Sequence, residues 1–167
     1  MFGLILIAAG YTACKKIEPY NSQAQLEIDD AIIAKYLVDS NLKDSGFVKD
    51  PSGLYYKVHR RGIDTGIITD TTLMYANYMA KVLTKPAYDK RLDSAFTFRL
   101  TGYVEGIRIG AKKIKVGGKI RMLIPSPLAY QQRYLKGNSS AGRDTILVPS
   151  NSILDYTLEI LSLNKKP

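Results

Sequence analysis

"KVGGKIRMLIPSPLAY", residues 115–130, combines a glycine turn, an alternating strand and an abrupt proline-rich end. In the middle of this stretch, apolar side chains alternate with Lys119 and Arg121, as in a strand that has one face in a core. The apolar positions are Ile120, Met122 and Ile124. Proline fixes φ and cannot continue a strand ladder, so the two prolines stiffen the strand exit. We therefore expect Tyr130 to be held in place at the start of a long loop.

Four other segments alternate in the same way. They are residues 53–60 (GLYYKVHR), 72–83 (TLMYANYMAKVL), 96–100 (FTFRL) and 153–161 (ILDYTLEIL). The side chains expected on the inner faces of these segments are Leu54, Tyr56, Val58, Met74, Ala76, Tyr78, Ala80, Val82, Phe96, Phe98, Leu100, Leu154, Tyr156, Leu158 and Ile160. This pattern predicts a series of strands with one buried face each.

Two further segments have helical spacing. Residues 104–114 place apolar side chains at offsets of three, seven and ten, and we expect this helix to end at the glycine pair 117–118. A second helix is predicted to begin at Ser22, which forms a capping box with Gln25, and to end near Asn41. The sequence thus predicts an α+β fold, in which an antiparallel sheet wraps around one short amphipathic helix and an extra N-terminal helix precedes it.

The first residues, "MFGLILIAAGYTAC", form a short apolar run that is followed by the only cysteine, Cys14. The run is too short to span a bilayer, which favours a secretory signal. "YTAC" resembles the lipobox of bacterial lipoproteins, in which cleavage falls just before a lipid-carrying cysteine. We interpret residues 1–13 as a signal peptide and residues 14–21 as a lipidated tether. The alternative is a buried N-terminal segment with an unmodified thiol.

The composition restricts the chemistry of the chain. Its 167 residues carry a formal net charge of +9, but the lysines and arginines are scattered, with no run longer than "KK". We therefore expect no nucleic-acid partner. His59 is the single histidine and has no cysteine or acidic cluster at ligand spacing, so we expect neither a metal site nor a cofactor. A cysteine pair and a phosphate-binding glycine loop are also missing from the sequence.

Several motifs follow one another in a fixed order: "FTFRL", "YVEGI", "KVGGKIRMLIPSPLAY" and "VPSNSILDYTLEIL". In this order they resemble the FKBP-type peptidyl-prolyl isomerases, from about Leu73 to Leu163. The upstream helix and "SGLYYKV" resemble the N-terminal part of lipoprotein members from the Bacteroidetes group. The resemblance implies an FKBP-like isomerase domain at residues 51–164, preceded by an N-terminal helical extension at residues 22–50.

The resemblance also implies which residues form the site. Tyr78 matches an aromatic residue that lies ten positions before the family's "FD" pair, which corresponds to Tyr88 and Asp89 here. Tyr130 matches the tyrosine whose hydroxyl reaches the substrate, and Val104 matches a residue whose backbone N–H binds a ligand carbonyl. Catalytic roles are thereby implied for Tyr78, Asp89 and Tyr130. The implied substrate-binding residues are Tyr88, Phe96, Val104, Ile107, Val148 and Tyr156.

Isomerisation of a peptide bond needs no nucleophile. Rotation about an X-Pro bond loses amide resonance and crosses a barrier of about 20 kcal/mol, and the twisted amide is less polar than the planar one. An apolar aromatic pocket with one or two donors lowers this barrier by binding the twisted form better. Asp89 would then orient pocket groups or act electrostatically on the substrate. Alternatively, it is a turn carboxylate that pairs with Lys90 or Arg91.

Three functions remain open from the sequence. The first is isomerisation of X-Pro bonds in proline-containing clients of the bacterial envelope, by a monomer whose lipid anchor lies on the periplasmic face of the outer membrane. The second is a peptide-binding or chaperone module with little turnover, because Ile107 replaces the family's tryptophan and Gln131 replaces a glycine. The third is an anionic-surface binder driven by the charge of +9, for which strong salt dependence would be diagnostic.

Overall fold

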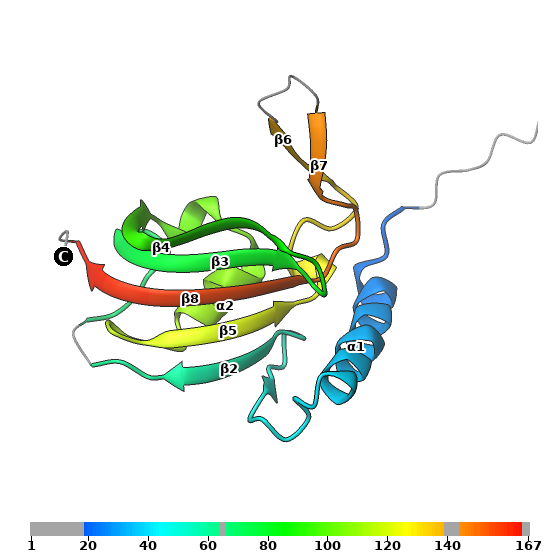
Figure 1. The fold of residues 1–167 in the computed structure, drawn as a ribbon, viewed down its shortest axis with the longest axis horizontal. Coiled ribbons are helices and arrows are strands. Elements are labelled where there is room, and N and C mark those ends of the chain that lie inside the picture. Colours follow the sequence, from blue (N-terminus) through cyan, green and yellow to red (C-terminus); the bar gives the residue numbers. More distant parts are fainter. Residues whose placement is uncertain (1–18, 64–65, 139–143, 165–167) are drawn as a thin grey trace, which may run out of the picture.

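An antiparallel sheet of six strands forms the body of the protein (Figure 1). The structure, a computed structural model, describes residues 19–63, 66–138 and 144–164. Within these residues the strand order is β1-β2-β5-β8-β3-β4, and β6 and β7 pair separately as a hairpin. The elements are α1 (Ser22–Asp39), β1 (Val48–Lys49), β2 (Tyr55–Arg60), β3 (Met74–Val82), β4 (Ala87–Phe98), η1 (Leu100–Gly102), α2 (Glu105–Ala111), β5 (Lys119–Ile124), η2 (Ser126–Leu128), β6 (Leu135–Asn138), β7 (Asp144–Val148) and β8 (Leu154–Leu163). The two η elements are short 3₁₀ helices.

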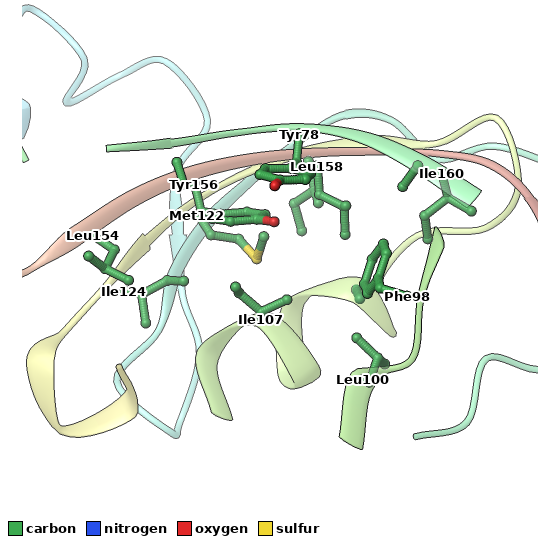
Figure 2. Packing of buried hydrophobic residues seen from close by; sticks show 14 of the residues in the cluster. Tyr78, Phe98, Leu100, Ile107, Met122, Ile124, Leu154, Tyr156, Leu158 and Ile160 are labelled. Atoms are coloured by element: carbon green, nitrogen blue, oxygen red, sulfur yellow. The ribbon is translucent and has the colours of Figure 1, made fainter. Parts of the chain in front are cut away.

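One face of this sheet carries the main core. The alternation predicted from the sequence is confirmed in three neighbouring strands, whose buried inward residues are Met74, Ala76, Tyr78, Ala80, Ile120, Met122, Ile124, Leu154, Tyr156, Leu158 and Ile160. Helix α2 lies across this face (Figure 1). Figure 2 shows Ile107 rising from α2 toward Met122 and Tyr156 on the sheet. The sheet therefore wraps around the one short helix, as the sequence predicts.

Two glycines allow α2 to approach β5 closely. A Cβ atom added to Gly106 would overlap with the Ile124 side chain, and one added to Gly110 would overlap with the Met122 sulfur. Both glycines are buried. A larger residue at either position would push the helix away from the sheet, because a close-packed interior has no spare volume for it. The glycines therefore set the depth of the core beneath the helix.

Helix α1 covers one end of the opposite sheet face. Leu123 lies on the face of β5 that also carries Lys119 and Arg121, yet it is fully buried because α1 packs over it. The buried residues of this second cluster are Ile33, Leu37, Leu83, Leu123 and Ile153. The Arg121 guanidinium donates to the Tyr36 hydroxyl of α1 at 3.0 Å, which adds a polar contact beside the apolar ones. The N-terminal helix is thus packed onto the sheet.

Three local predictions need correction. Asn21, the residue before the expected cap, caps α1, and its side chain accepts a hydrogen bond from the Ala24 N–H at 3.0 Å. Helix α2 ends at Ala111, before the glycine pair, and Gly117 instead supplies a turn with a φ of 76° that leads into β5. The segment after Tyr130, expected to be a loop, contains the β6–β7 hairpin, which projects away from the sheet (Figure 1).

The described residues contain neither a membrane-spanning helix nor a cluster of metal ligands. Across residues 19–63, 66–138 and 144–164, no helix is both long enough and apolar enough to cross a bilayer. In the same ranges, no group of three or more His, Cys, Asp or Glu side chains could hold a metal ion. His59 is exposed on β2, and desolvation together with nearby Lys57, Lys119 and Arg121 lowers its pKa, so the imidazole is neutral at pH 7.

We predict that Gly106→Ala destabilises the fold although alanine favours helices. Alanine gains about 1 kcal/mol over glycine inside a helix, whereas overpacking against Ile124 costs about 1–3 kcal/mol. Urea unfolding should therefore show a net loss of stability. Gly102→Ala is the matched control, because a Cβ atom there meets nothing within 4 Å, and it should lose no stability. Equal stability of both variants would show that α2 can move away from β5 without cost.

Candidate functional site

Three aromatic rings from three strands pack together on the core face. Tyr78 of β3 stacks on Tyr156 of β8, with ring centroids 5.6 Å apart and an interplanar angle of 7°. Phe96 of β4 meets Tyr78 edge-on, with centroids 5.5 Å apart and an angle of 72°. Figure 2 shows Tyr78 and Tyr156 lying together above Ile107. The structure thus brings three of the predicted site residues into one apolar wall.

The strand register places a carboxylate beside these rings. Ala80 of β3 pairs with Asp89 of β4, so the carboxylate emerges on the face that carries Tyr78. The Tyr78 hydroxyl donates a hydrogen bond to Asp89 Oδ2 at 2.7 Å. Asp89 therefore orients Tyr78. This contact agrees with the interpretation of Asp89 as a residue that orients neighbouring groups. The alternative pairing with Lys90 or Arg91 lies outside the side chains that the structure describes.

A β-bulge in β4 redirects Tyr88. Ala87 pairs with Lys81 and Asp89 pairs with Ala80, so Tyr88 has no partner residue on β3 and is the extra residue of the bulge. The Tyr88 and Tyr130 hydroxyls lie near each other, and each influences the pKa of the other. Burial is the main cause that raises the pKa of each hydroxyl, and the charge of Asp89 adds to it. Both phenols therefore keep their protons at neutral pH and can act as hydrogen-bond donors.

A groove of about 580 Å³ opens between the start of α2 and the chain that follows η2. Two predicted site residues line it: Val104, the N-cap of α2, and Tyr130. Tyr103 lines it as well, and its ring packs on Phe98 with centroids 4.8 Å apart. The remaining lining residues are Thr101, Gly102, Glu105, Pro127, Leu128, Ala129, Gln131, Arg133, Tyr134 and Leu135.

Tyrosine hydroxyls connect this groove with the apolar wall. Desolvation raises the pKa of Tyr103, and the nearby Asp89 and Tyr130 raise it further. Desolvation likewise raises the pKa of Tyr156, with smaller contributions from Tyr103, Tyr78, Tyr88 and Asp89. The side chains that share this electrostatic environment with Asp89 are Tyr78, Tyr88, Tyr103, Tyr130 and Tyr156. Of these, Tyr103 and Tyr130 line the groove, and Tyr78 and Tyr156 belong to the apolar wall.

Ile107 and Val148 are buried in the main core, as are Tyr78 and Tyr156. The exposed fraction is 4% for Ile107 and 0% for Val148, and both belong to the main core cluster. Ile107 lies beneath Met122 and Tyr156 (Figure 2), where the family resemblance implies an indole. Neither residue lines the groove. Both side chains are aliphatic, so neither presents a flat surface to a ligand.

The sequence does not single out two of the aromatic residues that line the groove. Tyr103 directly precedes Val104 in the motif "YVEGI", so its position beside a predicted binding residue was the available signal. Tyr134 is exposed, and Lys136 Nζ lies 5.8 Å from the centroid of its ring. No strand or helix pattern marks Tyr134, because it lies in the short connection between η2 and β6.

Comparison with known proteins identifies the family. A sequence profile of the family described as FKBP-type peptidyl-prolyl cis-trans isomerase matches residues 66–161. The chain belongs to this family. The FKBP-like α+β fold expected from the sequence is also confirmed, since solved FKBP-type structures superpose on this one.

Two FKBP-type relatives give the extent of the similarity. FkpA from Escherichia coli (strain K12) is 28% identical over 152 residues, which are 88% of this chain and 52% of that protein. The crystal structure of Escherichia coli FkpA superposes with a TM-score of 0.64 at 29% identity, covering 87% of this chain and 65% of that one. The crystal structure of AtFKBP13 superposes with a TM-score of 0.56 at 26% identity, and the superposition covers 70% of this chain and 97% of that one. This FKBP-type chain thus spans about half the length of the FkpA relative.

In this FKBP-type domain we predict that Tyr78→Phe weakens the site without unfolding it. The ring that stacks on Tyr156 is retained, while the hydrogen bond to Asp89 is lost, which costs about 1 kcal/mol. Urea unfolding beside the wild type measures the loss. Tyr75→Phe, the same change on the opposite face of β3, should stay within about 0.5 kcal/mol of the wild type. If both variants lose the same amount, the bond to Asp89 does not stabilise the site.

Proposed function

We propose that this domain catalyses cis/trans isomerisation of X-Pro bonds in polypeptides of the bacterial envelope. The observation that carries the proposal is a groove lined by Tyr103, Val104 and Tyr130, joined to the aromatic wall by the packed rings of Phe96, Phe98 and Tyr103. Membership of a family described as peptidyl-prolyl cis-trans isomerases supports the reaction class. The cell location rests on the lipobox-like "YTAC" motif of the sequence.

In the proposed mechanism the substrate enters the groove, and its proline is directed toward the aromatic wall, in which the Tyr78 and Tyr156 rings are buried. These rings exclude water, so the planar and more polar amide loses favourable solvation relative to the twisted one. The domain then binds the twisted amide better than either planar form, which lowers a barrier of about 20 kcal/mol. No covalent bond to the enzyme forms, and no proton has to move.

Two donors at the groove are placed to hold the substrate carbonyls. Tyr130 lines the groove, and its neutral hydroxyl can donate a hydrogen bond to a substrate carbonyl. Val104 is the N-cap of α2, and an N-cap N–H takes no part in the hydrogen bonds of the helix. Asp89 fixes the Tyr78 ring through their hydrogen bond and thereby keeps the wall in place.

A second candidate function is a peptide-binding module with little turnover. Two observations favour it. Ile107 is buried beneath the wall and offers a substrate proline no flat aromatic surface. Gln131, which follows Tyr130, has a φ of 57°, a conformation that glycine adopts at lower cost. A pocket with these features can bind a peptide even if it stabilises the twisted amide only a little.

Isomerisation of a Leu-Pro or Phe-Pro peptide by the purified domain tests the proposed reaction. We expect the wild type to exceed the spontaneous rate, and Tyr130→Phe to lower kcat/KM about tenfold because one transition-state hydrogen bond is lost. Asp89→Ala should lower it by a similar factor, because Tyr78 is no longer oriented. Tyr75→Phe, on the opposite face of β3, should be unchanged.

The same assay separates the two candidate functions. If the wild type binds the peptide but isomerises it only at the spontaneous rate, the domain is a peptide-binding module, and the proposal of an isomerase is wrong. Peptide binding is measured by fluorescence anisotropy of the same labelled peptide, beside Tyr130→Phe.

A lipid anchor on Cys14 is the remaining part of the proposal. Cys14 lies outside the described residues, and its assignment rests on the motif at residues 11–14. The proposed tether, residues 14–21, ends directly before α1, which is packed onto the sheet. An anchor there would hold the domain close to a membrane surface, within reach of envelope clients.

We predict that mass analysis of the membrane fraction of a bacterial host finds a lipidated N-terminal fragment beginning at Cys14. Cys14→Ala should abolish this fragment and move the protein to the soluble fraction. Lys15→Ala, a change next to the cleavage point that leaves the cysteine, should keep the fragment. An unmodified wild-type protein in the soluble fraction would contradict the anchor and leave the proposed isomerase activity untouched.

A further inference from the structure

The Ser126 carbonyl holds the backbone on both sides of Tyr130. The Ser126 carbonyl accepts hydrogen bonds from the Ala129 N–H at 3.0 Å and from the Gln131 N–H at 2.9 Å. These two amides lie on either side of Tyr130 in the chain. Gln131 is also fixed from its other side, because its carbonyl accepts from the Asn151 N–H at 2.7 Å. The direction of the Tyr130 side chain therefore depends on where Ser126 lies.

Ser126 is in turn held by a carboxylate from the N-terminal helix. Asp29 Oδ2 accepts two hydrogen bonds from Ser126, one from the backbone N–H and one from the hydroxyl, each at 2.6 Å. Asp29 Oδ1 accepts a third from Gln25 Nε2 at 2.8 Å. The exposed fractions are 1% for Asp29 and 0% for Ser126. A buried carboxylate with three donors is held in one position, because any movement would leave charge unsatisfied.

This contact joins parts of the chain that are 97 residues apart. Asp29 lies before residue 66, where the match to the FKBP-type family begins, and Ser126 lies within the match. The helix that carries Asp29 therefore lies outside the region that the family profile matches, and one of its side chains reaches the turn that presents Tyr130.

We propose that Asp29 is a positioning residue for Tyr130, so that helix α1 forms part of the working site. The proposal rests on the proposed isomerase activity, in which the Tyr130 hydroxyl holds a substrate carbonyl. Asp29 fixes the backbone of Ser126, and the Ser126 carbonyl fixes the two amides that flank Tyr130. Loss of Asp29 lets the turn relax while the aromatic wall, which belongs to other strands, stays in place.

Docking of α1 does not depend on this contact alone. Ile33 and Leu37 bury apolar surface against the sheet, and the Tyr55 hydroxyl donates to Asp30 Oδ1 at 2.6 Å. An ion pair between Lys49 and Asp30 at 2.6 Å adds to the same side of the helix. The effect of Asp29 on the turn can therefore be separated from its effect on helix docking.

The test compares three variants of the full-length protein with the wild type. Asp29→Ala removes the acceptor, Asp29→Asn keeps an acceptor oxygen of the same shape, and Leu37→Ala weakens α1 docking without touching the turn. Rates are expressed per folded molecule from urea unfolding curves. We expect Asp29→Ala to lower kcat/KM about tenfold, since small misplacement of a catalytic group costs large factors in rate. Asp29→Asn should recover most of it, and Leu37→Ala should stay within about twofold of the wild type.

Hydrogen exchange of the Gln131 amide provides a readout that does not depend on activity. We expect faster exchange of this amide in Asp29→Ala, with the central strands β3, β5 and β8 unchanged, and no such local change in Leu37→Ala. If Asp29→Ala and Leu37→Ala match in both kcat/KM and Gln131 exchange, Asp29 only stabilises the fold and the proposal is wrong. If the wild type does not accelerate isomerisation, the proposed function fails, and the exchange data alone decide whether Asp29 orders the turn.

Discussion

The close contact between α2 and β5 is the constraint on which the rest of the structure depends. Because Gly106 and Gly110 carry no side chain, the helix lies directly on Ile124 and Met122. The far end of the helix is tied down by Lys113, which follows it and pairs with Asp50 at 2.6 Å. The hydrogen bond from Lys113 lowers the pKa of Asp50 to about 2, so this tie persists over the whole neutral range. The start of α2, with the groove residues around it, has no freedom to drift from the sheet.

The strands could be predicted from the sequence because their signal is local. Alternation reports which face of a strand is apolar, and it identified the inward residues of β3, β5 and β8 correctly. It does not report what covers the other face, so the burial of Leu123 under α1 could not be read from β5 alone. The cap of α1 was misplaced by one residue, since Asn21 and Ser22 are both good caps and only the local backbone decides between them. The β6–β7 hairpin lies in a segment without clear alternation and was missed.

The candidate site required more than local pattern. The resemblance to a family supplied Tyr78, Asp89 and Tyr130, but their contacts depend on register. Asp89 reaches Tyr78 because it lies opposite Ala80 in the sheet, and a bulge changes the direction of Tyr88. Neither fact follows from the spacing of ten residues between Tyr78 and Tyr88. The Asp29–Ser126 contact spans 97 residues and has no sequence signature at all. Side chains that meet only after the whole chain has folded are invisible to periodicity.

The electrostatics of the site match a reaction without proton transfer. Burial is the leading cause that raises the pKa of Tyr88, Tyr103, Tyr130 and Tyr156, and the charge of Asp89 adds to it in each case. Burial and the charge of Asp89 thus disfavour ionisation of these phenols, which remain neutral and can donate hydrogen bonds. Catalysis by a general base would need the opposite arrangement, in which a neighbouring charge brings a titrating group close to neutral pH. The site instead combines dryness, shape and fixed donors, which are the properties that favour a twisted amide over a planar one.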